Sequence, residues 1–98
     1  MPRHLLKVLS IIAFKECVLN EQVTPSKIQR LFGKRANDDL EELRTMNLIT
    51  ITPKGKKNLI NVTDDFLNLF KIPLDPEEAK KAIQTGLRDY ALRQLQFD

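Results

Sequence analysis

The spacing of apolar residues changes at residue 48, and that change limits the folds that the chain can adopt. Before residue 48, apolar side chains recur three and four positions apart, which is typical of amphipathic helices. Residues 48–52 then read Leu-Ile-Thr-Ile-Thr, a run rich in β-branched residues, and residues 57–62 form a second such run. Between them, Pro53 suits the second position of a turn and Gly55 its last position. The sequence therefore predicts helices followed by a two-stranded hairpin.

Three helices are predicted before the hairpin. The first spans residues 3–19 and is apolar on so many sides that it should lie at the centre of the core. Thr24 as N-cap and Pro25 at the first helical position begin the second helix, and Gly33 ends it because glycine tolerates positive φ. The third helix covers residues 37–46. Three helices and a two-stranded wing make a winged helix-turn-helix domain, an α+β fold that is mostly α.

Two more helices are predicted after the hairpin. Thr63 caps the fourth helix and Pro73 ends it, whereas Asp75 and Pro76 are typical of the start of a fifth helix. The fifth helix carries an apolar stripe, and a stripe of this kind must be buried against something.

The predicted helices suggest a division of the chain. We expect residues 1–73 to form the winged-helix domain. We expect residues 74–98 to form a C-terminal helix that either packs on that body or makes a dimer contact. The candidate residues for the dimer contact are Ile83, Leu87 and Tyr90.

The composition narrows the class of protein. The chain has 98 residues, of which 42% are hydrophobic and 30% charged, and this suits one small globular domain. With one cysteine, Cys17, and one histidine, His4, it can form neither an intramolecular disulfide nor a Cys/His zinc site. No Gly-rich phosphate loop or catalytic constellation is visible, so we expect no metal, no cofactor and no enzymatic activity. No signal peptide or membrane-spanning run is visible either, and we expect a cytoplasmic protein.

Two passages of the sequence carry a family resemblance. Residues 9–15 read Leu-Ser-Ile-Ile-Ala-Phe-Lys. Residues 55–72 combine a wing glycine, a threonine helix cap and two phenylalanines four positions apart. Through these passages, residues 5–73 resemble the second winged-helix domain of the family of segregation and condensation protein B (ScpB). The positions in the second passage that match the family pattern are Gly55, Leu59, Thr63, Phe66, Leu67 and Phe70.

The resemblance implies a role in chromosome organisation. A chain similar to ScpB would be a non-catalytic subunit of the complex that SMC (structural maintenance of chromosomes) ATPases form with a kleisin. It would act in chromosome condensation and segregation by binding the kleisin ScpA, and it would be associated with the nucleoid. The sequence departs from the family pattern where Lys57 and Ile60 replace a wing proline and a strand tyrosine. It also has about four extra residues between the first two helices, in the region of residues 17–22.

The predicted third helix is acidic, which bears on the choice between a protein and a DNA partner. Asp38, Asp39, Glu41 and Glu42 stand against one base, Arg44. In a winged helix that reads DNA, this helix enters the major groove, where the phosphates repel carboxylates. The acids are therefore either a solvated helix face or a surface for a basic protein partner. The candidate partner-binding residues are Asp38, Glu41, Glu42 and Leu69.

A second candidate surface is basic. Lys54, Lys56 and Lys57 cluster at the hairpin tip, and we expect Lys34 and Arg35, in the turn before the third helix, to lie near them. Such residues either give weak, salt-sensitive, sequence-independent binding to nucleic acid or keep the hairpin tip from aggregating. The alternative functions are thus a dimeric winged-helix transcription regulator that binds DNA and an adaptor in another assembly, such as the transcription machinery.

Overall fold

The computed structural model describes residues 2–97, with side chains described for residues 2–86. In chain order its elements are α1 (Arg3–Ala13), the π-helical turn η1 (Phe14–Val18), α2 (Pro25–Phe32), α3 (Ala36–Thr45), β1 (Ile49–Lys54), β2 (Lys57–Val62), α4 (Asp64–Leu69) and α5 (Pro76–Phe97). The helix predicted over residues 3–19 is α1 and η1 together. The two strands form an antiparallel sheet. The fold is a winged helix followed by two C-terminal helices, as the sequence predicts.

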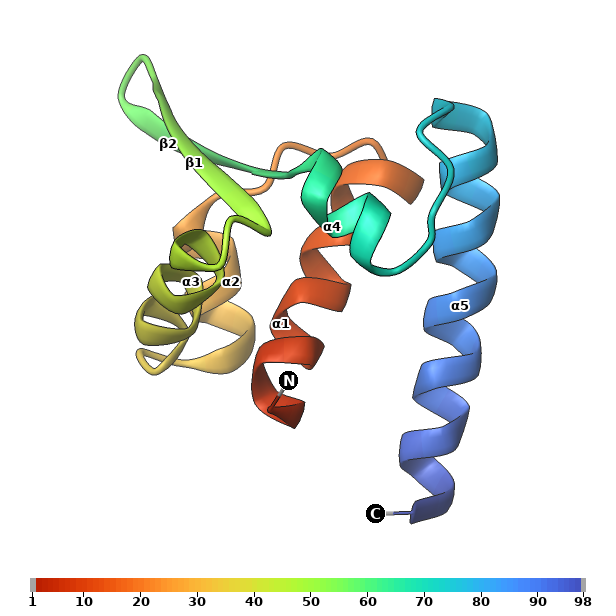
Figure 1. Cartoon of the computed structure of the whole chain (residues 1–98). Coiled ribbons are helices and arrows are strands. Elements are labelled where there is room, and N and C mark those ends of the chain that lie inside the picture. Colours follow the sequence, from red (N-terminus) through yellow and green to blue (C-terminus); the bar gives the residue numbers. More distant parts are fainter. Residues whose placement is uncertain (1, 98) are drawn as a thin grey trace.

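Helix α1 runs through the middle of the molecule, with α2 and α3 on one side and α4 and α5 on the other (Figure 1). Leu5, Leu9 and Ile12 of α1 have no exposed surface. Residues of the other elements that join the same buried cluster include Ile28, Leu43, Ile49, Ile60, Phe66 and Ile83. Truncating a large aliphatic side chain at such a position costs about 2–5 kcal/mol. The wing and the last helix are therefore attached to the same core as the three N-terminal helices.

The helix starts follow the predicted capping residues. Thr24, Thr63 and Asp75 each accept a hydrogen bond on a side-chain oxygen from the backbone N–H three residues later, at 3.3, 3.2 and 3.1 Å. These bonds satisfy N–H groups that have no partner within the helix. Gly33 ends α2 with φ of 82°, so the predicted start and end of that helix are confirmed.

Helix α4 ends before Pro73, for a local reason. Lys71 has φ of 56°, and its N–H donates to the carbonyl oxygen of Asn68 at 3.2 Å. The N–H of Ile72 donates to the carbonyl oxygen of Leu67 at 2.7 Å. This is a Schellman motif, which closes the last helical turn without help from a proline. The prediction that Pro73 ends α4 is therefore wrong. Helix α3 ends in the same motif, with Asn47 in the positive-φ position.

The turn of the wing lies further along the chain than the sequence predicts. Lys54 is directly opposite Lys57, so only Gly55 and Lys56 form the turn, and Pro53 is a residue of β1. Two-residue hairpin turns favour positive φ at their first central position because this matches the twist of the strands. Gly55 has φ of 63° there. Glycine, and not Pro53, therefore sets the register of the hairpin.

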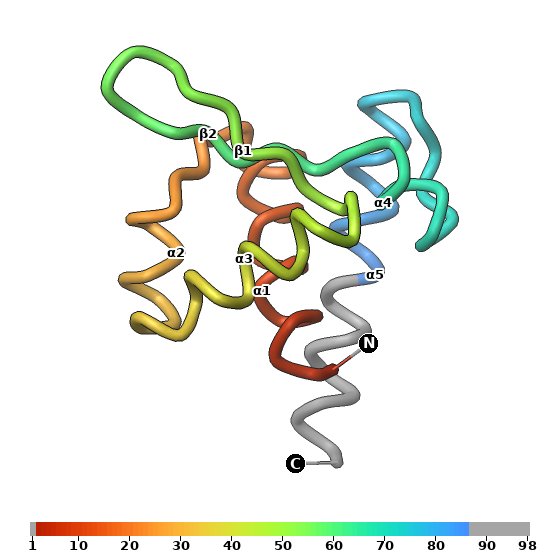
Figure 2. Tube along the Cα trace, turned by 60° about the vertical axis from the view of Figure 1, so that its left-hand side comes forward, coloured from red at the N-terminus to blue at the C-terminus, as the bar shows by residue number. Residues whose placement is uncertain are grey.

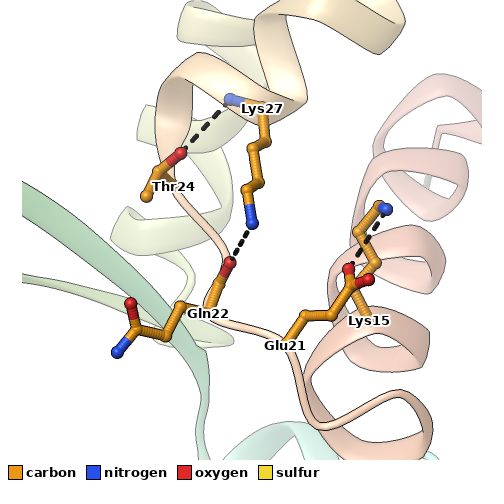
Figure 3. A network of polar contacts seen from close by, with 5 residues as sticks. All are labelled: Lys15, Glu21, Gln22, Thr24 and Lys27. Carbon is orange, nitrogen blue, oxygen red and sulfur yellow. Dashed lines mark hydrogen bonds and ion pairs between the residues drawn. The ribbon is translucent and has the colours of Figure 1, made fainter.

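The connection between η1 and α2 overlaps the region where the sequence has extra residues. Figure 3 shows its polar contacts: Lys15 Nζ lies 3.4 Å from Glu21 Oε2, and Lys27 Nζ donates to the carbonyl oxygen of Gln22 at 2.8 Å. The backbone N–H of Lys27 also donates to the Thr24 hydroxyl. The connection is thus fastened to the helix on each side of it.

Helix α5 packs against η1 through its first turns. Ala79 is buried, and Ile83, with 2% of its surface exposed, belongs to the core of its own chain. In this conformation Ile83 is already covered, so it presents no surface to a second copy. The other two dimer candidates, Leu87 and Tyr90, lie outside the residues whose side chains are described. The dimer contact and the division of the chain at residue 73 both stay predictions.

Candidate partner-binding surfaces

The four acids of α3 fall into two groups. Asp38, Glu41 and Glu42 are exposed. Asp39 is only 6% exposed, and its Oδ1 atom lies 3.3 Å from Nε2 of His4, at the start of α1. Asp39 therefore ties α3 to α1, and three acids remain for a partner or for solvent.

Glu41 is engaged within its own helix. Arg44, three residues later, donates to the Glu41 carboxylate through Nε at 3.2 Å and through Nη2. This hydrogen bond, reinforced by the positive charge of Arg44, lowers the pKa of Glu41 below its ordinary value. The pair leaves Asp38 and Glu42 as the exposed carboxylates of α3 that the structure pairs with no cation among the described residues.

The C-terminal end of α3 meets the N-terminal end of α4. The Thr63 hydroxyl donates to the carbonyl oxygen of Asn47 at 2.7 Å, and Asn47 Nδ2 donates to Asp65 Oδ2 at 2.5 Å. Met46 is 44% exposed on the α3 side of this junction, and Leu69 is 59% exposed on α4. Two large apolar side chains thus remain exposed, Met46 beside the junction and Leu69 at the far end of α4.

We call this junction the α3–α4 surface and define it by Glu42, Met46, Asp65 and Leu69. Glu42 and Met46 are four positions apart, as are Asp65 and Leu69, and residues at this spacing share one face of a helix. All four are exposed. The surface therefore offers an acid and an apolar side chain from each helix.

The α3–α4 surface contains part of what the sequence predicts. Glu42 lies close to the junction, whereas Asp38 lies at the other end of α3 and Leu69 at the far end of the short helix α4. Met46 and Asp65 were not predicted as site residues. Met46 shares the helical spacing of the buried residues of α3, and nothing in that spacing shows that the chain turns away at Asn47 and leaves Met46 exposed.

The basic residues do not form one patch. Lys54, Lys56 and Lys57 are exposed at the tip of the wing. The turn between α2 and α3, which carries Lys34 and Arg35, lies at the opposite end of this helix pair from the wing, as the two views in Figures 1 and 2 show. The expectation that Lys34 and Arg35 lie near the wing lysines is therefore wrong. The wing leaves from the C-terminal end of α3, and the turn precedes its N-terminal end.

The structure assigns no reactive chemistry to the thiol. Cys17 is half-buried in η1, and burial, with a smaller contribution from the charge of Glu16, raises its pKa to about 11. A thiol with this pKa is protonated near neutrality and is a poor nucleophile and a poor metal ligand. Within the described part of the chain, no three His, Cys, Asp or Glu side chains gather as metal ligands, and no helix is both long and apolar enough to cross a membrane.

Comparison with known families gives a match over most of the chain. Residues 1–78 match the family described as segregation and condensation complex subunit ScpB. The chain belongs to the ScpB family. Among curated proteins, none matches the chain. The matched segment holds α1 to β2, all of α4 and the first residues of α5, so both helices of the α3–α4 surface lie within the part that is characteristic of ScpB.

The ScpB-family chain also has an apolar cavity of about 300 Å³ between α1, α4 and α5. Phe66 and Phe70, whose ring centroids are 5.1 Å apart, form one wall. The rest of the lining is apolar except at Ser10 and Lys71. A lining of this kind can hold apolar groups.

Proposed function

We propose that this ScpB-family chain is a non-catalytic subunit of an SMC–kleisin complex and binds the kleisin ScpA through the α3–α4 surface. In this role it acts inside the cell, at the nucleoid, in chromosome condensation and segregation. Family membership supports the role as a subunit of a segregation and condensation complex. The observation that carries the binding surface is the exposure of Met46 one turn after Glu42 and of Leu69 one turn after Asp65, on two helices joined by hydrogen bonds.

The chemistry of the surface describes the partner segment. An apolar side chain that leaves water on binding contributes up to about 1.5–3 kcal/mol, so Met46 and Leu69 supply affinity. Glu42 and Asp65 supply selectivity, because each carboxylate attracts lysine or arginine and repels acids. The partner segment should therefore be amphipathic and basic. A helix with apolar residues three and four positions apart fits this description.

The same charges weigh against the alternative of a transcription regulator that reads DNA through α3. Asp38 and Glu42 would face the phosphates of any duplex that received α3 in its major groove. A regulator would also need tight and sequence-dependent binding that persists at physiological salt. Fluorescence anisotropy with labelled duplexes at two salt concentrations distinguishes the two functions, and we expect at most weak binding that salt abolishes.

The test of the proposal is a titration of purified ScpA from the same organism with the full chain, measured by calorimetry. We expect Leu69→Asp and Glu42→Lys each to weaken binding about tenfold or more. Matched controls exist on other helices. Leu31 is 55% exposed on α2, and Glu77 is exposed on α5, so Leu31→Asp and Glu77→Lys should change the affinity less than about twofold.

Circular dichroism establishes that each variant is folded before it is titrated. If ScpA does not bind the unchanged chain, the proposed partner is wrong. If ScpA binds the Glu42→Lys and Leu69→Asp variants as tightly as the unchanged chain, the proposed surface is wrong.

A further inference from the structure

The two edges of the wing differ in their hydrogen bonding. The outer edge of β2 is occupied: the N–H of Ile60 donates to the carbonyl oxygen of Val23 at 2.8 Å, and the N–H of Val62 donates to Glu16 Oε2 at 2.7 Å. The residues that occupy it come from η1 and from the connection after η1. The hairpin is therefore closed at the base of its β2 side, at Ile60 and Val62.

The outer edge of β1 is open. In an antiparallel pair, residues whose backbone groups face the partner strand alternate with residues whose groups face away. The N–H of Thr63 donates to the carbonyl oxygen of Leu48 at 3.2 Å, and this bond fixes the alternation. The backbone groups of residues 50, 52 and 54 thus face β2, while those of Ile49, Ile51 and Pro53 face away. Within the described part of the chain, no hydrogen bond from the outward groups of Ile51 is recorded.

We propose that the outer edge of β1 binds an extended, acidic segment of a protein partner as a third strand of the wing sheet. Strand addition of this kind satisfies the N–H and C=O groups of an exposed edge, and side-chain pockets give the selectivity. Pro53 offers a carbonyl oxygen but no N–H, so the ladder cannot continue past it. The docked segment is therefore short and lies beside residues 49–53.

The charge of the wing indicates the chemistry of the segment. Residues 49–62 contain three lysines and no aspartate or glutamate. Lys54 and Lys57 are directly opposite each other, and like charges in this position destabilise a hairpin. A carboxylate of the added strand, placed beside Lys54, would relieve this repulsion. The unpaired backbone groups of β1 and the positive charge of the wing thus point to the same occupant.

The side chains of β1 specify how the segment alternates. Ile51 is half-buried on the face that packs against the core, whereas Thr50, Thr52 and Lys54 are exposed on the other face. An added strand would place one set of its side chains beside Ile51 and the other beside the threonines and Lys54. The expected pattern is therefore apolar residues alternating with acidic ones.

A protein strand fits this edge better than a nucleic acid does. The edge presents donors and acceptors in alternation, and a strand pairs with both, whereas a phosphate backbone accepts hydrogen bonds but donates none at its phosphates. The site does not depend on kleisin binding at the α3–α4 surface.

The test uses the full ¹⁵N-labelled chain and two synthetic peptides of alternating valine and glutamate. One peptide is unmodified, and the other is N-methylated at every amide so that neither of its edges can pair. Amide hydrogen exchange is followed by NMR. We expect the unmodified peptide to slow the exchange of the Ile51 amide about tenfold or more, and the N-methylated peptide to leave it unchanged.

A protein variant gives a second readout. Ile51→Pro removes the outward N–H but leaves the bonds that neighbouring residues make to β2, so it should abolish peptide binding, while Ile51→Val should retain it. If Ile51→Pro does not fold, the N-methylated peptide decides the question. Leu69→Asp should leave peptide binding unchanged, which separates this test from the kleisin test.

Two results would overturn the inference. If both peptides bind equally and shift only the signals of residues 54–57, the contact is electrostatic and no strand is added. If a short DNA duplex protects the Ile51 amide as well as the unmodified peptide does, the wing is a site for polyanions in general and not for a protein strand.

Discussion

Glu16 and Val62, 46 residues apart in the sequence, are joined by a hydrogen bond of 2.7 Å from the Val62 backbone N–H to Glu16 Oε2. The other carboxylate oxygen accepts a bond of 2.8 Å from Asn61 Nδ2. Glu16 lies in the π-helical turn η1, a geometry that is rare and often found at functional sites. One carboxylate thus attaches the end of the first helix to the end of the wing.

Glu16→Ala should destabilise the fold, because it leaves the part-buried Val62 N–H without its acceptor. We expect a loss of about 1–3 kcal/mol in the free energy of unfolding, measured by urea denaturation. Glu16→Gln keeps an oxygen acceptor and should lower the free energy of unfolding by less. Glu21→Ala removes only an exposed contact to Lys15 and should cost about 0–1 kcal/mol. Equal losses for Glu16→Ala and Glu21→Ala would contradict the role given to Glu16.

Ile83→Ala should lower stability in a way that does not depend on protein concentration, because Ile83 is buried within its own chain. The expected loss is about 2–5 kcal/mol in thermal or urea unfolding. Gln84→Ala, at an exposed neighbouring position, is the control and should change stability by less than about 0.5 kcal/mol. A loss that grows as the protein is diluted would indicate that Ile83 is buried between two copies instead.

Two glycines should respond to alanine in opposite directions. Gly55 has φ of 63° in the wing turn, so Gly55→Ala should cost about 1–2 kcal/mol although nothing lies within 4 Å of the added methyl group. Gly86 lies within α5 with equally open surroundings, and Gly86→Ala should stabilise the fold by up to about 1 kcal/mol. Paired thermal denaturation curves test both, and a stabilising Gly55→Ala would contradict the turn described here.

Cys17 should react slowly with thiol reagents at neutral pH. Because its pKa is about 11, the thiolate fraction and the rate of reaction with a disulfide reagent should rise until the pH approaches that value. Denaturation in urea should accelerate the reaction at pH 8, since an unfolded thiol ionises more readily. The raised pKa also means that the free energy of unfolding falls as pH rises from about 9 towards 11. A reaction midpoint near 8.5 in the folded chain would show that Cys17 is exposed.

The features that the sequence predicts correctly are set by neighbouring residues. Thr24, Thr63 and Asp75 act on an N–H three residues away, so their capping role is visible in any short stretch of sequence. The family resemblance, carried mainly by the wing and α4, is confirmed by the family match.

The features that cannot be predicted from the sequence depend on distant contacts or on competing local motifs. The position of the wing turn follows from the pairing of Lys54 with Lys57. The turn propensity of Pro53 does not reveal this pairing. The separation of Lys34 from the wing follows from the antiparallel course of α2 and α3. The open edge of β1 becomes visible only after the partners of Ile60 are known, because those partners close the other edge.

The burial of Ile83 has a consequence for work with fragments. The family match ends at residue 78, but the core that holds the matched helices together also includes a side chain from the following turns of α5. A DNA fragment that encodes only the matched segment would lack Ile83, which lines the same cavity as Leu9 and Phe66, and would leave these two side chains less covered. Low yield or aggregation of the resulting protein would then reflect where the chain was cut.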